Sequence, residues 1–246
     1  MKTEIAWKSE CLADNVRLLR WGEVGTPVLL FPTSGTDGED QERFGLVGSL
    51  APQLEAGKIK VYAFDAPESK ALIDPALKPA DKAAIQRQFL MAVADEVVPK
   101  IRQDCGGAEL PIISAGASIG AYHALVALAS YPNLFHSAIC MSGTFDLTRF
   151  FPNFHNHDFH LISPMHFLAY MGDGPHLELL RKRFVVLATG EGKWESPWES
   201  WQLATLLGKK SVPNRVDMWG KEFHHDWATW RAMLPKYVDE LLSRPE

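Results

Sequence analysis

Residues 110–130 have the sequence LPIISAGASIGAYHALVALAS. An apolar run comes first, the pattern Gly-x-Ser-x-Gly follows at residues 116–120, and a stretch rich in Ala and Leu comes last. The apolar run is typical of a strand, and the last stretch is typical of a buried helix. Between a strand and a helix, the two glycines permit a strained turn that projects the serine from the edge of a sheet.

This setting predicts that Ser118 is a nucleophile at a helix N-terminus. The backbone N–H of Ile119 would lie beside it, where it can donate a hydrogen bond to a developing oxyanion. The alternative is a serine that only caps its helix.

A second oxyanion donor is expected in the loop that follows the apolar run 27–32. The loop residues are Thr33, Ser34 and Gly35, which are small enough for the backbone to approach a substrate closely. The alternative for this segment is a plain Ser/Gly turn.

Strand-like and helix-like stretches alternate along most of the chain, which predicts a largely parallel sheet flanked by helices. Strands are expected at 15–20 (as an edge strand), 27–32, 58–65, 110–114, 135–141, 183–189 and 215–219. Helices are expected at 43–56, 79–103 with a kink at Pro99, 121–130, 198–207 and 226–242. Residues from about 143 to 181 show no clean period, so we expect one domain over residues 1–246 with an irregular insertion that forms a lid or pocket wall.

The composition limits the class of protein. Hydrophobic residues make up 46% of the 246 residues, and the 22% that are charged include both signs, which is unlike a disordered chain. The net charge is −5 and no Lys/Arg cluster stands out, so a nucleic-acid partner is not expected. The three cysteines lack the spacing of a disulfide framework or zinc site. With neither a signal-peptide core nor a membrane-spanning segment, the sequence predicts a cytoplasmic protein that does not bind membranes.

A serine hydroxyl is a weak nucleophile at neutral pH, so it needs a base within hydrogen-bond reach and an acid that orients the base. Along the chain, the expected order is serine, acid, histidine. His224 and His225 both follow the last predicted strand. Asp226 resembles the N-cap of the closing helix, which would place His225 at the junction of loop and helix. We therefore expect His225 to be the base, with His224 as the alternative.

Three acidic residues are candidates for the orienting acid. Glu191 and Glu195 both follow the strand predicted at 183–189, and Asp146 follows the strand before it. Spacing alone does not choose between the two glutamates. Asp146 could instead cap a helix that begins near residue 147.

Together these residues resemble the putative esterase family of α/β-hydrolases, which includes S-formylglutathione hydrolases, enterochelin esterases, feruloyl esterases and mycolyltransferases. The resemblance covers most of the chain and is most specific at AGASIGAYHA (115–124), ATGEGKWES (188–196) and HHDWATWRAML (224–234). It implies an α/β-hydrolase fold. The family ending His-Asp-Trp-x-x-Trp implies His225 as the base, and the Gly-x-Trp-Glu ending of the preceding loop implies Glu195 as the acid.

The expected activity is hydrolysis of a small-molecule carboxylic ester through an acyl-enzyme. Ser118 attacks the acyl carbonyl, His225 takes its proton, Glu195 orients His225, and water then releases the acyl group. No metal or organic cofactor is expected, and a homo-oligomer is left open. The alternatives are thioester hydrolysis or acyl transfer with the same residues, and a non-catalytic binding protein on a hydrolase scaffold.

Several histidines are not expected to act in chemistry. His155, His157, Asp158 and His160 could suggest a metal site, but no glutamate base or helical HExxH pattern accompanies them. We expect them to line an acyl or alcohol pocket, and His123 to pack in the core. Five tryptophans near the acid and base loops are expected to pack and hold those loops, or else to form an aromatic pocket wall: Trp194, Trp198, Trp201, Trp227 and Trp230.

Overall fold

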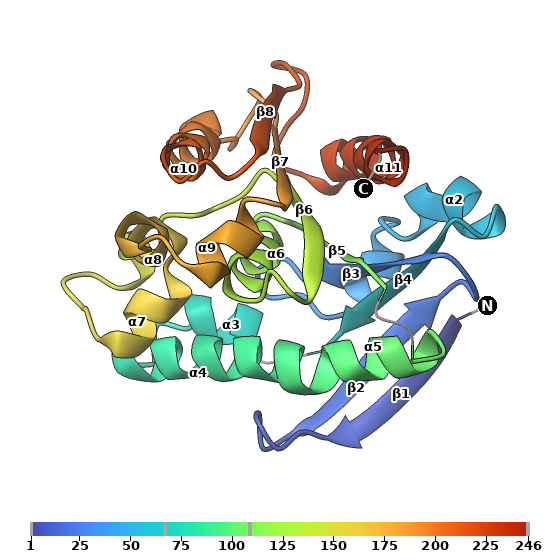
Figure 1. The fold of residues 1–246 in the computed structure, drawn as a ribbon, viewed down its shortest axis with the longest axis horizontal. Helices are drawn as coiled ribbons and strands as arrows, with labels where there is room; N and C mark the ends of the chain where they lie inside the picture. The colour runs from blue at the N-terminus through green and yellow to red at the C-terminus, as the bar shows by residue number, and fades with distance from the viewer. Residues whose placement is uncertain (1, 66–67, 108–109, 245–246) are drawn as a thin grey trace.

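An eight-stranded sheet runs through the centre of the computed structural model, which describes residues 2–65, 68–107 and 110–244 (Figure 1). The strand order is β1-β2-β4-β3-β5-β6-β7-β8. Strands β3 to β8 are parallel, whereas β1 and β2 are antiparallel to their neighbours. The strands are β1 (Lys2–Lys8), β2 (Asn15–Trp21), β3 (Thr26–Phe31), β4 (Ile59–Phe64), β5 (Ile112–Ala117), β6 (Phe135–Met141), β7 (Phe184–Thr189) and β8 (Asn214–Met218).

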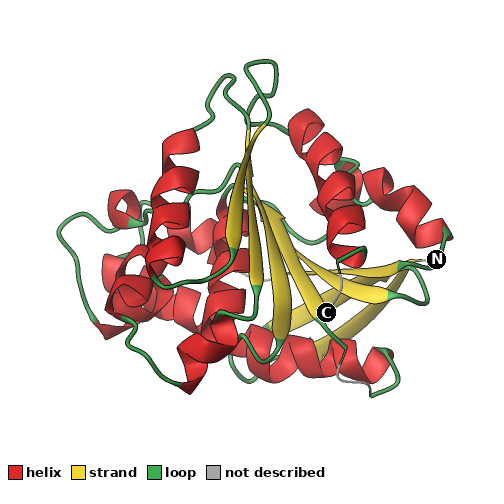
Figure 2. Cartoon of the chain, turned by 45° about the horizontal axis from the view of Figure 1, so that its top comes forward, coloured by secondary structure: helices red, strands yellow, loops and turns green. Residues whose placement is uncertain are grey.

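Helices cover both faces of the sheet (Figure 2). They are α1 (Asp40–Arg43), α2 (Ala51–Glu55), α3 (Glu68–Ile73), α4 (Pro79–Ala92), α5 (Val98–Asp104), α6 (Ile119–Ser130), α7 (His157–Ile162), α8 (Pro164–Tyr170), α9 (Pro175–Leu180), α10 (Pro197–Lys209) and α11 (Trp227–Leu242). Two 3-10 turns, η1 (Gly48–Leu50) and η3 (Thr148–Phe150), and one π-helical turn, η2 (Val93–Val97), complete the described elements. None of the helices among the described residues is both long and apolar enough to cross a membrane.

The core consists of two apolar layers, one on each face of the sheet. On one face, Leu18 and Phe64 pack with residues of α4, α6 and the helices between residues 157 and 180. On the other face, Leu19 and Ala63 pack with residues of η1 and α11. Because both faces are covered, β4 is buried along its whole length, including Lys60, whose ammonium pairs with Asp104.

Each predicted strand is present within a few residues, but the edge of the sheet was predicted wrongly. Strand β2 is an inner strand that pairs with β1 on one side and β4 on the other. The edge strand is β1, which the sequence did not reveal because its side chains are only half-buried on one face and exposed on the other. Its weak alternation of apolar and polar residues carries little signal.

Two of the predicted helices are interrupted. The helix expected at 43–56 is wrong: α1 ends at Arg43, and Gly45 adopts a positive φ of +77° before η1 and α2 begin. The helix expected at 79–103 is present as α4, the π-helical turn η2 and α5, with Pro99 in the first turn of α5. A π-helical turn accommodates a proline, which has no N–H to continue the α-helical pattern.

The insertion between β6 and β7 is more regular than its sequence suggested, because it contains η3, α7, α8 and α9. Local signals start these short helices. The Asn156 side chain accepts a hydrogen bond from the backbone of Phe159, and Pro164 and Pro175 occupy the first turns of α8 and α9. Helix α7 packs on α4, and α8 packs on α10. The role of the insertion as a lid or pocket wall stays a prediction.

His123 packs in the core, as the sequence predicts. It lies fully buried on α6, with its Nε2 atom 2.8 Å from Oε1 of Gln86 and its ring against Phe89 and Tyr122. Desolvation by burial lowers the pKa of His123 to about 3. The imidazole is therefore neutral in the folded protein at neutral pH.

This buried histidine predicts a loss of stability in mild acid. In the unfolded chain the pKa of His123 returns to about 6.5, so between pH 6.5 and 3 only the unfolded state takes up the proton. The free energy of unfolding should then fall by about 1.4 kcal/mol per pH unit, or about 2 kcal/mol at pH 5. Urea unfolding at pH 7 and pH 5 measures the change. His123→Gln can still bond Gln86 but does not titrate, so its stability should depend less on pH by this amount. If the free energy of unfolding depended on pH equally in the wild-type protein and in His123→Gln, the prediction would be contradicted.

Candidate active site

Ser118 lies at the turn between β5 and α6, where the sequence predicts the nucleophile. It is half-buried and has φ +56° and ψ −119°, a strained conformation that costs a non-glycine residue about 1–3 kcal/mol. The flanking glycines are needed because a Cβ atom on Gly116 would lie 2.3 Å from the backbone of Gly120. A Cβ atom on Gly120 would lie 2.4 Å from the carbonyl oxygen of Phe31. The pattern Gly-x-Ser-x-Gly thus reflects close backbone packing around Ser118.

The approach of Gly120 to the end of β3 also places the predicted oxyanion segments together. Strand β3 ends at Phe31, so Thr33, Ser34 and Gly35 begin beside the start of α6. Thr33 is buried, Ser34 is half-buried and Gly35 is exposed. The backbone N–H of Thr36 donates to the Thr33 carbonyl at 3.2 Å and closes the turn. The start of α6, where Ile119 is the first residue, and this turn therefore lie at the same edge of the sheet.

The last residue of β6 and the loop after it contact the backbone of Ser118 on both sides. The Ser118 N–H donates to the Met141 carbonyl at 2.9 Å, and the Thr144 N–H donates to the Ser118 carbonyl at 3.3 Å. Between these two residues lies Ser142, which is buried and has a positive φ of +48°. The Ser142 N–H donates to the Ala188 carbonyl of β7 at 2.7 Å. Ser142 is thereby held between the predicted nucleophile and the strand that precedes the predicted acid.

The structure places Glu195, rather than Glu191, beside the predicted base. The Glu195 side chain is fully buried, and its Oε2 atom is 3.9 Å from Nδ1 of His225. Its carboxylate accepts hydrogen bonds from Ser142 Oγ at 2.6 Å and from Thr189 Oγ1 at 3.1 Å. Glu191 is exposed in the same loop, where its backbone N–H donates to Gly220.

The loops that carry the predicted acid and the predicted base pack closely against each other. A Cβ atom on Gly190 would lie 2.0 Å from the Phe223 carbonyl oxygen, and one on Gly192 would lie 2.1 Å from His224 Nδ1. The Gly192 N–H donates to the Phe223 carbonyl at 3.0 Å, and the Lys193 N–H donates to His224 Nδ1 at 2.9 Å. His224 therefore accepts a backbone hydrogen bond that joins the two loops.

His225 has a different environment from its neighbour. Its side chain is 24% exposed, and its ring lies edge-on to the ring of Trp230, with the ring centroids 5.2 Å apart. The backbone N–H of His225 donates to the Lys193 carbonyl. Its Nδ1 atom is buried and, among the residues that the structure describes, has no hydrogen-bond partner. Asp226 caps α11, as predicted, because its side chain accepts from the Thr229 N–H at 2.9 Å. This cap fixes the point at which the His225 loop ends.

Asp146, the third candidate acid, is engaged elsewhere. Its Oδ1 atom accepts hydrogen bonds from the backbone N–H of Thr148 at 2.9 Å and from Thr148 Oγ1 at 2.7 Å. This matches the alternative in which Asp146 holds the start of a helical turn, here η3.

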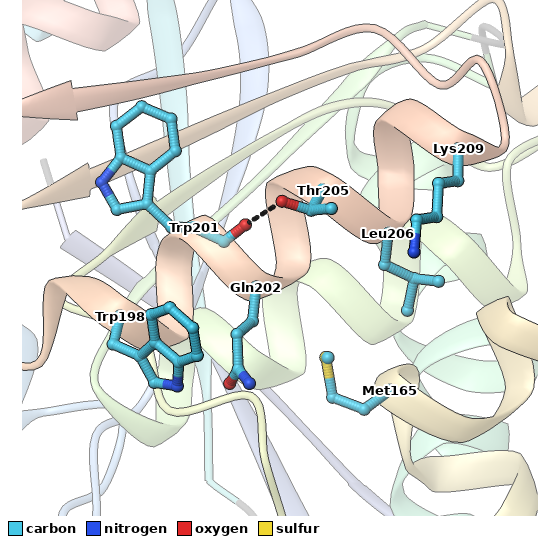
Figure 3. Close-up of a pocket in the computed structure, with 7 residues that line it drawn as sticks. All are labelled: Met165, Trp198, Trp201, Gln202, Thr205, Leu206 and Lys209. Atoms are coloured by element: carbon cyan, nitrogen blue, oxygen red, sulfur yellow. Dashed lines mark hydrogen bonds between the residues drawn. The ribbon is translucent and has the colours of Figure 1, made fainter.

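The five tryptophans divide into two groups. Trp230 is buried and Trp227 stacks on Phe44, so these two pack as the first interpretation predicts. For Trp194, Trp198 and Trp201 that interpretation is wrong, because they are 75%, 68% and 49% exposed. Figure 3 shows Trp198 and Gln202 on α10 and Met165 on the facing helix α8. Seven residues of these two helices line a cavity of about 340 Å³: Met165, Trp198, Trp201, Gln202, Thr205, Leu206 and Lys209.

The histidine-rich segment lies in the insertion. His157, Asp158 and His160 are on α7, and the ring of His155 is 5.6 Å from the ring of His166. His166 Nδ1 is 2.7 Å from Ser163 Oγ, and desolvation by burial lowers its pKa. Within residues 2–65, 68–107 and 110–244, no group of three or more His, Cys, Asp or Glu side chains is arranged to hold a metal ion. Pocket lining by this segment stays a prediction.

Sequence reasoning missed three residues around the acid: Ser142, Thr189 and Trp230 as a hydrogen-bond donor. Ser142 and Thr189 are small polar residues at the ends of two adjacent parallel strands, β6 and β7. That position was a usable signal, because the carboxyl ends of parallel strands meet at one edge of the sheet, where sites form. Trp230 gave no such signal, because a tryptophan on the apolar face of a helix predicts only a residue of the hydrophobic core.

Comparison with known proteins supports the predicted fold. Residues 61–240 match the model of a family described as putative esterase. No protein of curated function matches the sequence. Among solved structures, an S-formylglutathione hydrolase from Agrobacterium tumefaciens has a TM-score of 0.77 at 12% identity, covering 99% of this chain and 95% of that chain.

Two further structures are similar over their full lengths. A ferulic acid esterase has a TM-score of 0.74 at 12% identity, covering 98% of this chain and 97% of that chain. A fluorophosphonate-binding serine hydrolase F from Staphylococcus aureus has a TM-score of 0.67 at 13% identity, covering 99% of both chains. At these identities the likeness shows the fold, and the predicted α/β-hydrolase fold is confirmed.

Proposed function

Since the chain belongs to the putative esterase family of α/β-hydrolases, we propose that it is a serine hydrolase that cleaves carboxylic esters through an acyl-enzyme on Ser118. One observation supports the proposal: Ser118, Glu195 and His225 all lie in segments that follow the carboxyl ends of parallel strands, namely β5, β7 and β8. Ser118 projects from a strained strand–helix turn, and the buried carboxylate of Glu195 lies 3.9 Å from His225. Their order along the chain is the one that this fold uses for a triad.

In the proposed mechanism each group has its own step. Nδ1 of His225 faces Glu195, which leaves Nε2 to take the proton of Ser118 as its Oγ attacks the acyl carbonyl. The resulting oxyanion accepts hydrogen bonds from the N–H of Ile119 and from an N–H in the turn of Thr33, Ser34 and Gly35.

The intermediate then collapses. The bond from carbon to the alcohol oxygen breaks, and His225 returns its proton to the leaving alcohol. A water molecule, deprotonated by His225, attacks the acyl-enzyme and releases the acid and free Ser118.

Glu195 orients His225 and stabilises its charged form. Their separation of 3.9 Å exceeds a hydrogen bond, and triad contacts in ligand-free enzymes commonly tighten when substrate binds. We expect a small rotation of the His225 ring to bring Nδ1 within hydrogen-bond reach of Oε2.

The proposal is tested by covalent labelling. A fluorophosphonate probe should label the protein with one adduct per chain, and hydrolysis of p-nitrophenyl acetate should decline in proportion. Tandem mass spectrometry should locate the adduct on Ser118, and Ser118→Ala should remain unlabelled. An adduct on another residue, or full labelling without loss of hydrolysis, would contradict the mechanism. A non-catalytic binding protein on this scaffold would give no adduct.

Thioester hydrolysis is the second candidate. The chain shares its fold with an S-formylglutathione hydrolase, and S-formylglutathione is a thioester. Steady-state rates on matched acetyl esters and thioesters, with an alcohol or thiol added as competing acceptor, separate ester hydrolysis, thioester hydrolysis and acyl transfer. We expect kcat/KM to be larger for the ester, and water to be the preferred acceptor.

A further inference from the structure

A buried serine connects the acid of the proposed triad to the core. Ser142 is 4% exposed and follows directly on the last residue of β6. Its Oγ atom is 2.6 Å from Glu195 Oε1 and 3.0 Å from the indole nitrogen of Trp230. One hydroxyl thus contacts both a carboxylate and a residue of α11.

The chemistry of these groups fixes the direction of both hydrogen bonds. An indole N–H can only donate, so the Ser142 oxygen accepts from Trp230. Serine has a single hydroxyl proton, and the carboxylate of Glu195 can only accept it. Ser142 can therefore donate its proton only to Oε1 of Glu195.

The second hydroxyl near Glu195, that of Thr189, has two possible acceptors. Thr189 Oγ1 is 3.1 Å from Glu195 Oε2 but also 3.0 Å from the carbonyl oxygen of Gly190. Its one proton can serve either acceptor. Oε2 is also the atom that faces His225, so the bond from Ser142 to Oε1 anchors the carboxylate while leaving Oε2 for the base.

Trp230 contacts the other partner of this pair as well. Its ring lies edge-on to the ring of His225, with centroids 5.2 Å apart. The same indole thus donates to Ser142 and packs against His225. A glutamate side chain has three rotatable bonds, so without such anchors its carboxylate would sample several positions.

We propose that Ser142 is a positioning residue that acts through Glu195: with Trp230, it holds Oε2 towards His225. This inference rests on the proposed function, because it assumes that Glu195 is the acid. Ser142 adopts a positive φ of +48°, a conformation in which glycine would be less strained. A purely structural turn would therefore favour glycine over serine at this position.

This backbone conformation supplies a sharp pair of variants, Ser142→Gly and Ser142→Ala. Both remove the hydroxyl and its bonds to Glu195 and Trp230, but glycine relieves the strained φ, so we expect Ser142→Gly to unfold at a higher urea concentration than Ser142→Ala. Both variants should lower kcat for p-nitrophenyl acetate about 10- to 100-fold, with KM within about twofold, because only the alignment of the base is disturbed. Trp230→Phe, which keeps an aromatic ring and removes the N–H, should lower kcat by a smaller factor. A loss of kcat that follows the loss of stability, and is therefore much smaller in Ser142→Gly than in Ser142→Ala, would overturn the proposal.

A double-mutant cycle tests whether Ser142 acts through Glu195. In the Glu195→Gln background, Ser142→Ala should change kcat less than about threefold, because the carboxylate that it positions is already absent. Independent, multiplicative losses would overturn the proposal. Wild-type kcat in both Ser142 variants, with Ser118→Ala inactive, would overturn the role of Ser142 and leave the esterase assignment intact. If Ser118→Ala were active, the proposed serine esterase function would be wrong, and the inference about Ser142 would lose its basis.

Discussion

Replacing Ser118 with alanine is expected to lower kcat for p-nitrophenyl acetate about 10⁴- to 10⁶-fold. Alanine removes the atom that would form the acyl-enzyme in the proposed mechanism, whereas the proposed oxyanion donors at Ile119 and at residues 33–35 stay in place. The residual rate should therefore still exceed hydrolysis in water, by about 10³- to 10⁴-fold. Initial rates at substrate saturation, measured with enzyme purified separately from wild type, give the comparison.

Ser114 offers a matched control for this prediction. It lies on β5, the strand that precedes Ser118, and its hydroxyl oxygen is 2.9 Å from the carbonyl oxygen of Ala124 and 3.2 Å from that of Ser137 inside the core. Ser114→Ala should keep kcat within about threefold while lowering the free energy of unfolding by about 1 kcal/mol. Comparable activity in the two alanine variants would rule out Ser118 as the nucleophile.

Replacing Glu195 with glutamine is expected to lower kcat about 10³- to 10⁴-fold. An amide carries no charge to stabilise the imidazolium, and its NH₂ group facing Nδ1 would favour the wrong tautomer of His225. Glutamine is nearly isosteric, so the fold should persist, and thermal unfolding checks this. The pH dependence of kcat/KM should be recorded for both proteins.

Glu191→Gln is the matched control, because it makes the same change in the same loop at an exposed side chain. Its kcat should stay within about twofold of wild type, as is usual for a surface substitution. The reverse result, with Glu191→Gln inactive and Glu195→Gln active, would show that the acid has been assigned to the wrong glutamate.

The two glutamates show how far the sequence could predict the site. Both follow β7 at a suitable distance, so spacing does not separate them, and only the resemblance of the Gly-x-Trp-Glu ending to the family favoured Glu195. The choice depends on which side chain enters the core, and that is set by the packing of Gly190 and Gly192 against Phe223 and His224, more than 30 residues away. Such long-range backbone contact has no local signature in the sequence.

The position of Ser118 at a turn between a strand and a helix could be predicted because its constraints are local. The glycines at 116 and 120, the strand before them and the helix after them all lie within about 20 residues, and each element has a clear composition. Strand β6 was predicted with its observed bounds, 135–141, for the same reason. By contrast, the helix expected at 43–56 failed at Gly45, whose positive φ interrupts a stretch with helical periodicity.

The close packing of residues 190–195 on residues 220–225 has a consequence for the redesign of this scaffold. Gly190 and Gly192 leave no room for even a methyl group between the two segments, so neither can change its path without displacing the other. The two segments therefore form a single interlocking module that must be transplanted together when loops are exchanged with another hydrolase. Under the proposed function, substrate preference would be varied in segments outside this module, such as the helices between β6 and β7.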